Sequence, residues 1–290
     1  MNTIFLGNGL NRLDSDYSWE HLLDELKLQS NLPRDLTFDG VPFPLLYEEI
    51  YLRSAFTSNS PPQRDTRLRA LVSEKCKQLK PNSLTRAVLS AGCPNIITTN
   101  YDYALEDDLK NLLKKSSDPE SGPEIDYRIH TYNQCGDVRV WHIHGEANYP
   151  RTLVLGHDMY ARNIGKMSAY VEKRGYDELF AQSNSLREST VCWMDLFFNT
   201  DVHILGFAME FSEIDVWWVI NLRARLIKEM KTSGKPFPEN KVYFHTRYRH
   251  LKKSFRELLE SHYIEIVPDP DAINYYLHYR EIIKKMSAES

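Results

Sequence analysis

Short apolar runs alternate along this chain with longer segments in which apolar residues recur at helical spacing. The runs have the length of strands and predict strands at 3–6, 95–99, 138–143, 153–155, 202–205, 241–245 and 263–267. The spacing between them predicts helices at 19–28, 103–113, 214–230, 251–259 and 272–286. Strands that alternate with helices favour a parallel sheet covered on both faces. We therefore expect an α/β fold with a doubly wound, mainly parallel, Rossmann-like sheet.

Two regions depart from this alternation. At about 40–92 the periodicity is helical throughout, and at 157–186 a tyrosine-rich segment follows a short predicted strand. We interpret both as helical insertions that wall a pocket or form a partner surface. The stretches 59–62 and 116–123 predict surface loops. Because 290 residues can fill one elaborated core, we expect a single domain over residues 1–290.

Composition limits the partners and the compartment. The net charge of −4 gives no electrostatic reason to expect direct binding to nucleic acid, although a local basic patch would still be compatible with it. The four cysteines are widely spaced and form no Cys-x-x-Cys pair, which favours buried thiols over disulfides or a zinc site. No uninterrupted apolar stretch is long enough to span a bilayer. We expect a cytoplasmic protein that makes no membrane contact.

Glycines and polar residues interrupt four of the apolar runs at the carboxyl end. Gly7-Asn8-Gly9 and then Asn11 follow the first run, and the two glycines would let a phosphate approach the main chain. Later runs end in Thr99-Asn100-Tyr101-Asp102, in His142-Ile143-His144-Gly145 and in Leu205-Gly206-Phe207. Since the carboxyl ends of parallel strands lie along one edge of a sheet, the four interruptions predict one pocket.

Two of these interruptions carry side chains suited to catalysis. Asp102 either binds a ligand or caps the predicted helix at 103–113, and the two roles are compatible. His142 and His144 lie two residues apart, so they would share one face of a strand. A metal pair is one interpretation, but no neighbouring Cys or carboxylate completes a ligand set, and a hydrogen-bonded core histidine is favoured for His142. His144 directly precedes Gly145 and is the predicted proton acceptor.

In their order and spacing, the four motifs resemble the sirtuin fold. The resemblance covers residues 1–220 and includes the segment Leu153–Tyr160 that follows the histidine. It is strongest to the bacterial sirtuin-like proteins of antiphage defence, which hydrolyse NAD. Family deacetylases carry four zinc-binding cysteines, and the absence of that spacing here disfavours protein deacetylation. The family's Gly-Ala-Gly is Gly7-Asn8-Gly9 in this chain.

The resemblance implies roles for individual residues. Asn100 would position water or the ribose, Asp102 would hold the nicotinamide amide, and His144 would accept a proton. NAD would be the substrate, and no metal would be needed. Asp215, at the start of the predicted helix 214–230, could instead favour the helix dipole. The residues that we expect to contact NAD are Gly7, Asn8, Gly9, Asn11, Thr99, Gly206, Phe207 and Asp215.

The implied activity is that of an NAD glycohydrolase, which releases nicotinamide and ADP-ribose and depletes NAD during phage infection. Because uncontrolled hydrolysis would kill the host, the resemblance also implies a gate. The expected forms are homo-oligomerisation or a HerA-like hexameric ATPase partner. The alternative is a non-catalytic subunit that binds NAD or ADP-ribose within a defence complex. A nuclease component has less support, because clustered metal-binding carboxylates are absent from the sequence.

Overall fold

The structure is a computed structural model, and it describes ten segments of the chain. These are residues 1–11, 19–33, 40–54, 61–106, 113–116, 129–180, 192–237, 239–247, 251–269 and 273–289. Within them, the side chains at 19–20, 29, 61–63, 113–116, 177 and 289 are not described.

One eight-stranded sheet runs through the described residues, in the order β3-β4-β5-β2-β1-β6-β7-β8. In this spatial order, every neighbouring pair from β5 through β2, β1, β6 and β7 to β8 is parallel. At the other edge, β3 pairs with β4 and β4 pairs with β5 in antiparallel orientation. Taken in chain order, the six parallel strands follow 3-2-1-4-5-6, the arrangement of doubly wound dinucleotide-binding sheets. The predicted α/β Rossmann-like fold is therefore confirmed. The strands are β1 (Asn2–Leu6), β2 (Asn95–Thr98), β3 (Leu113–Ser116), β4 (Thr131–Cys135), β5 (Val138–His142), β6 (Asp201–Leu205), β7 (Val242–Thr246) and β8 (Ile264–Pro268).

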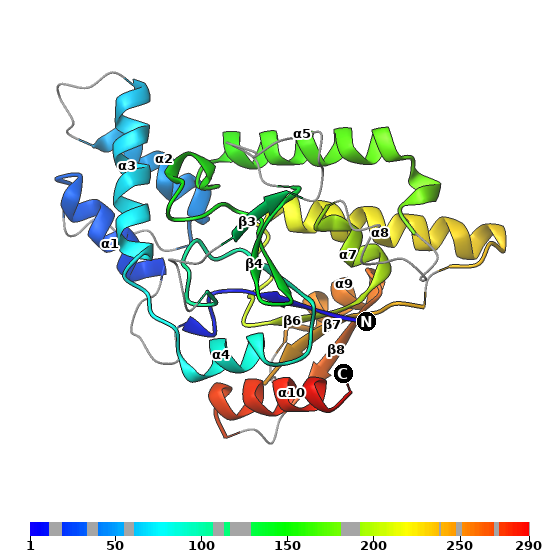
Figure 1. The fold of residues 1–290 in the computed structure, drawn as a ribbon. Coiled ribbons are helices and arrows are strands. Elements are labelled where there is room, and N and C mark those ends of the chain that lie inside the picture. Colours follow the sequence, from blue (N-terminus) through cyan, green and yellow to red (C-terminus); the bar gives the residue numbers. More distant parts are fainter. Residues whose placement is uncertain are drawn as a thin grey trace.

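Helices cover both faces of the sheet because its central strands are apolar on both sides. On one face, Ile4 and Leu6 of β1 pack with α4 (Ser83–Leu89) and α10 (Tyr275–Glu289). On the other face, Phe5 packs in the core that includes α7 (Met194–Asn199) and α8 (Ile214–Ser233). Figure 1 shows α5 (His157–Arg174) beyond α8, on the side opposite α10. α9 (Lys253–Ser261) lies beside β8.

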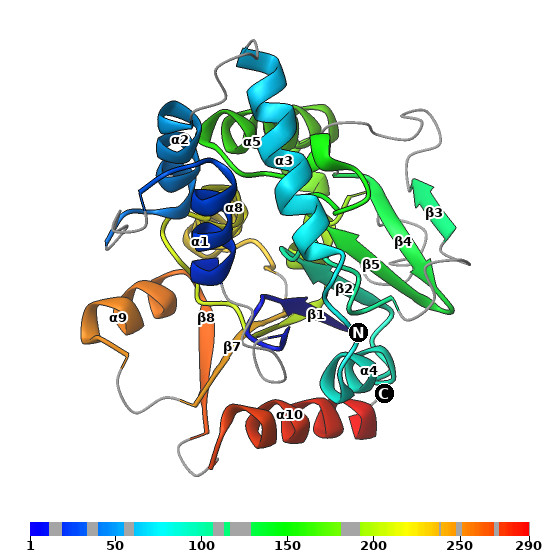
Figure 2. The ribbon, with the colours of Figure 1, turned by 90° about the vertical axis from the view of Figure 1, so that its left-hand side faces the viewer.

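A third group of helices, α1 (Trp19–Gln29), α2 (Phe43–Arg53) and α3 (Pro61–Cys76), lies to one side of the sheet (Figure 2). Apolar residues at helical spacing, such as Leu68 and Val72 of α3, form its core. The same core contains Tyr101, Ala147 and other residues that follow the carboxyl ends of β2 and β5. The three helices therefore pack over the edge of the sheet at which the four predicted motifs end.

Three of the predicted elements are wrong. Residues 153–155 form no strand and lie between η3 (Pro150–Thr152) and α5, where Val154 donates a backbone hydrogen bond to His144. The predicted helix 103–113 begins instead as a turn at 103–106, and Leu113 starts β3, while 107–112 lie outside the described residues. The predicted loop 59–62 overlaps α3, which begins at Pro61.

The polar edge strand β3 and its neighbour β4 were not predicted, because their sequences contain no apolar run. Within the region 40–92, the described residues form α2, α3 and α4, and 55–60 lie outside the described residues. Within 157–186, they form α5 and η4 (Tyr176–Glu178), and 181–186 are outside the described residues, as are 117–123 of the second predicted loop.

The expectations about cysteines and membrane segments can be compared with the structure directly. Cys76, Cys93 and Cys192 are buried free thiols, and Cys135 is a half-buried free thiol. Among the helices of the described residues, none combines the length and the apolar character needed to cross a bilayer.

Candidate functional site

The four predicted motifs lie at the carboxyl ends of four adjacent strands. Gly145, Asn100, Gly7 and Gly206 follow β5, β2, β1 and β6, and these strands are neighbours in that order. Because neighbouring strands lie about 4.8 Å apart, the four turns span about 15 Å of one sheet edge. Between β1 and β6 the strand order reverses, which is where doubly wound sheets bind their ligands. The expected convergence of the motifs is present.

The glycine turn after β1 packs directly on the turn after β6. The backbone N–H of Gly7 donates to Leu205 O (3.0 Å), and that of Gly9 donates to Gly206 O (2.8 Å). A Cβ on Gly7 would lie 2.6 Å from the Cα of Phe207, and one on Gly9 would lie 2.7 Å from the Cα of Gly206. Backbone packing therefore requires these glycines here, in addition to any phosphate that they admit.

Asparagine side chains tie the turns after β1 and β2 together. The Asn11 amide donates to Asp102 Oδ2 (2.8 Å) and to Asn8 Oδ1 (3.3 Å). The Asn100 amide donates to Gly7 O (3.4 Å), and that of Asn82 at the start of α4 donates to Leu10 O (3.1 Å). Residues 72 to 93 positions apart in the sequence thus form one hydrogen-bonded rim beside the glycine turn.

Asp102 is buried at this rim. Its Oδ1 accepts from the backbone N–H of Ala104 (2.9 Å), but residues 103–106 form a turn, so the alternative in which Asp102 caps a helix at 103–113 is wrong. Burial raises the pKa of the Asp102 carboxyl to about 6, against the opposing effect of the Ala104 N–H. Asp102 is thus a carboxylate that can change its charge near neutral pH.

Thr99 and Phe207 lie among these turns without a side-chain contact that would mark a ligand. The Thr99 backbone N–H donates to Leu6 O (3.3 Å). The Phe207 ring packs on Phe5, with ring centroids 4.9 Å apart. Their predicted contacts with a bound dinucleotide stay predictions.

His144 does not share a strand face with His142, as the sequence suggested, because β5 ends at His142 and residues 143–144 form a turn. The His144 ring instead faces α8. Its Nε2 lies 3.0 Å from Asp215 Oδ2, and its Nδ1 lies 3.6 Å from Glu213 Oε2. Asp215 also accepts from the Asn163 amide (2.6 Å). Since a carboxylate only accepts, Nε2 carries the proton that binds Asp215.

The surroundings of His144 favour its charged form. Burial disfavours the imidazolium, but the carboxylates of Asp215 and Glu213 outweigh burial and raise the pKa of His144 above its usual value. His144 is 2 % exposed and Asp215 is fully buried, whereas the Glu213 side chain is 22 % exposed. Glu213 accepts from the Tyr160 hydroxyl (3.0 Å), and the Tyr160 ring packs edge-on against the His144 ring, with ring centroids 5.5 Å apart.

The spacing of His144, Glu213 and Asp215 would also fit a metal ion, since one ligand atom from each lies within 4.8 Å of the others. Both oxygens of Asp215 already accept hydrogen bonds, from His144, from the Asn163 amide and from the Val216 backbone N–H. The arrangement therefore has the geometry of a carboxylate that orients an imidazole.

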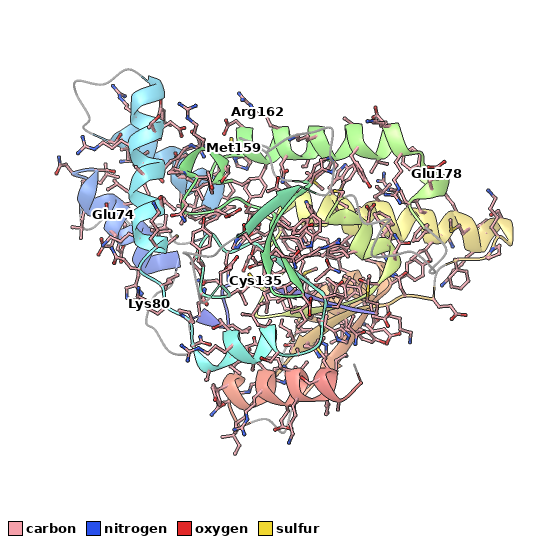
Figure 3. The ribbon with its side chains drawn as sticks, in the orientation of Figure 1. Glu74, Lys80, Cys135, Met159, Arg162 and Glu178 are labelled. Atoms are coloured by element: carbon pink, nitrogen blue, oxygen red, sulfur yellow. The ribbon has the colours of Figure 1, made fainter. Side chains whose placement is uncertain are left out.

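Sequence reasoning missed Glu213, Tyr160 and Asn163. Tyr160 and Asn163 lie three residues apart on the inner face of α5, and Figure 3 places Met159 and Arg162 at the same end of this helix, with Arg162 on its outer side. The sequence did offer one signal for Glu213. It is an acidic residue directly before the helix, two positions from Asp215 in the first turn. Asp215 was expected to contact the dinucleotide and is found bonded to His144.

A protein-family model described as SIR2-like domain matches residues 94–267, which is more than half of the chain. The matched region contains Asn100, Asp102, His144 and Asp215, and it begins after the glycine turn at residues 7–9. No curated protein matches the chain.

Proposed function

This chain belongs to the SIR2-like domain family, and we propose that it cleaves the nicotinamide–ribose bond of NAD to give ADP-ribose and nicotinamide. SIR2-like domains bind NAD, and the family implies NAD-dependent enzymatic activity. The observation that carries the hydrolase proposal is the His144–Asp215 pair beside the strand-end turns that contain Asn100 and Gly7. A positioned base beside a dinucleotide crevice is what addition of water to a ribose carbon requires.

The proposed reaction breaks the bond between ribose C1′ and the nicotinamide nitrogen, and the electron pair leaves with neutral nicotinamide. Positive charge then develops on the ribose, where the buried carboxylate and amide oxygens of Asp102 and Asn100 stabilise it. Water oxygen bonds to C1′, and its proton passes to Nδ1 of His144. The carboxylate of Asp215 holds the Nε2 proton and stabilises the imidazolium that forms.

The direct test is an assay of the purified chain with NAD, alone and together with a candidate ATPase partner, in which released nicotinamide is measured by chromatography. We expect nicotinamide and ADP-ribose in equal amounts. NAD that binds but is never cleaved under either condition would contradict the proposal.

NAD that binds without being cleaved would support the alternative function, a non-catalytic subunit that binds NAD or ADP-ribose. The observation that favours this alternative is the state of His144, whose ring is buried and whose pKa is raised by its carboxylate partners. A charged imidazole cannot accept a proton. Turnover that depends on His144 distinguishes the two functions.

We also propose that the activity depletes NAD in antiphage defence and is gated by homo-oligomerisation or by a HerA-like hexameric ATPase. The resemblance to defence proteins suggests this role. The burial of His144 supports a gate, because Glu213 and Tyr160, which contact its ring, would have to move before NAD could approach Nδ1. Light scattering with and without the partner, alongside the nicotinamide assay, tests the gate; a monomer that is active by itself would contradict it.

Tyr160→Phe is expected to open access to His144, because the change removes the hydroxyl that holds Glu213 over Nδ1 and leaves the ring packing intact. Modification of His144 by diethyl pyrocarbonate, followed by peptide mass spectrometry, should become faster, and basal nicotinamide release should rise. Tyr176→Phe, which removes a hydroxyl from a half-exposed tyrosine in η4, is the matched control. Unchanged modification of His144 in Tyr160→Phe would rule out this latch.

Nicotinamide release is expected to increase with pH through a midpoint above 6.5, because the base must be neutral and its pKa is raised. Asp215→Asn removes a charge that raises this pKa, so the midpoint should fall. Profiles of kcat against pH for both proteins check the sign, with the exposed Asp158→Asn as the control. A midpoint that rises or stays in place in Asp215→Asn would contradict the assignment of His144 as the base.

A further inference from the structure

One imidazole ring joins the two ends of the turn that carries Asn100 and Asp102. Nδ1 of His142 lies 2.8 Å from the backbone carbonyl oxygen of Asn100, and Nε2 lies 2.8 Å from Glu106 Oε1. The side chains of His142 and Glu106 are each 1 % exposed. The predicted role of His142 as a hydrogen-bonded core histidine is confirmed, and its two partners lie at the first and last residues of the turn.

The two partners determine the charge of the ring. A carbonyl oxygen and a carboxylate both accept hydrogen bonds, so both ring nitrogens must donate and His142 is an imidazolium. Burial opposes this charge, but the Glu106 carboxylate outweighs burial and raises the pKa of His142 to about 9. A neutral ring has one N–H and could keep only one of the two bonds.

The groups around this ion pair come from three elements. Tyr103 and Asp102 belong to the same turn after β2, Glu146 follows β5, and β4 contributes the neutral Asn133. The Asn133 amide donates to Glu106 Oε1 (3.0 Å) and to Glu146 Oε2 (3.2 Å). Among the described residues, His142 is the cation that contacts Glu106, and Glu106 Oε2 has no hydrogen-bond partner.

We propose that Glu106 and His142 are positioning residues, whose ion pair fixes the turn so that the Asn100 amide and the Asp102 carboxylate face the glycine turn. This inference rests on the proposed NAD cleavage. The Asn100 backbone is held by His142 on one side, while its amide reaches Gly7 O on the other. Loss of either ring proton would therefore loosen the residue that faces the ribose. A displacement of about 1 Å can cost about a hundred-fold in rate.

Glu106→Gln tests the proposal, because glutamine has the same shape and its Oε1 still accepts from Nε2, but the charge that keeps the ring doubly protonated is removed. NMR titration should show that the pKa of His142 falls from about 9. The kcat for nicotinamide release should fall about a hundred-fold at pH 8 and less at pH 6, with KM for NAD little changed. Glu146→Gln is the matched control, because it removes a second buried carboxylate of the same network, whose charge raises the pKa of His142 less than that of Glu106 does.

The possible results separate this inference from the proposed function. A wild-type chain that never releases nicotinamide contradicts the proposed function, and the positioning role fails with it. An active wild type with an unchanged kcat in Glu106→Gln, despite a lowered His142 pKa, overturns the positioning role alone. If Glu106→Gln does not fold, Glu106→Asp carries the test, since it keeps the charge but shortens the side chain. Its kcat should fall with the wild-type pH dependence, and a wild-type kcat in Glu106→Asp would overturn the proposal.

Discussion

Replacing His144 by alanine is expected to lower nicotinamide release from NAD by about a hundred- to ten-thousand-fold, the usual effect of removing a general base. The imidazole is the group that Asp215 orients, and within the described residues no other histidine contacts that carboxylate. Loss of the ring removes both the proton acceptor and the imidazolium charge that Asp215 stabilises. The rate is measured as nicotinamide released per enzyme at saturating NAD.

His157→Ala is the control for this experiment, because His157 is exposed at the start of α5, close in sequence to the segment that pairs with His144. NAD affinity, measured by calorimetry, should change little in His144→Ala, since the base acts on water or a hydroxyl and the glycine turn is untouched. Thermal unfolding shows whether the variant keeps its fold once Asp215 has lost a partner. A folded His144→Ala protein with the wild-type rate would refute His144 as the base.

Gly145→Ala is expected to lower the free energy of unfolding by about 2–6 kcal/mol, the sum of backbone strain and overpacking. Gly145 has a φ of +92°, a conformation that residues with a Cβ rarely adopt. A Cβ there would also collide with the backbone carbonyl of Thr152, which cannot rotate away as a side chain could. Urea unfolding measures the loss.

Two other glycines separate the two causes. Gly136, in the turn between β4 and β5, has a φ of +59° but nothing within 4 Å of a Cβ, so Gly136→Ala should show the strain alone, about 1–2 kcal/mol. Gly165 lies in α5 without positive φ or a close neighbour, so Gly165→Ala should gain about 0.5–1 kcal/mol. Equal losses in Gly145→Ala and Gly136→Ala would show that the Thr152 contact costs nothing.

The sheet was predictable wherever a strand is buried on both faces. The run 3–6 forms β1, and its residues alternate between the cores on the two faces of the sheet, which is why the run reads as continuously apolar. The polar strands β3 and β4 carry no such signal, because the backbone pairing that holds them in the sheet does not require apolar side chains. Segment 153–155 is apolar and buried like a strand, but the helices α1–α3 cover it instead of strand neighbours.

The candidate site also contains residues that the sequence predicts and residues that it does not. The residues at the strand ends, Gly7, Asn100, His144 and Gly206, were predictable, because parallel strands place their carboxyl ends along one edge. The partners of His144 were not, since Glu213 and Asp215 lie at the start of α8, about seventy residues later in the chain. The different partners of His142 and His144 were also not predictable, because they depend on the residue at which β5 ends.

By itself, the sequence determined the fold class and the edge of the sheet at which chemistry is placed, because both follow from local periodicity and from where apolar runs stop. Only the tertiary structure decided which carboxylate each histidine meets, and hence that His142 is held charged by Glu106 while His144 is oriented by Asp215. The physical reason is that a buried charge takes its state from the groups packed against it, and packing brings those groups from distant parts of the chain.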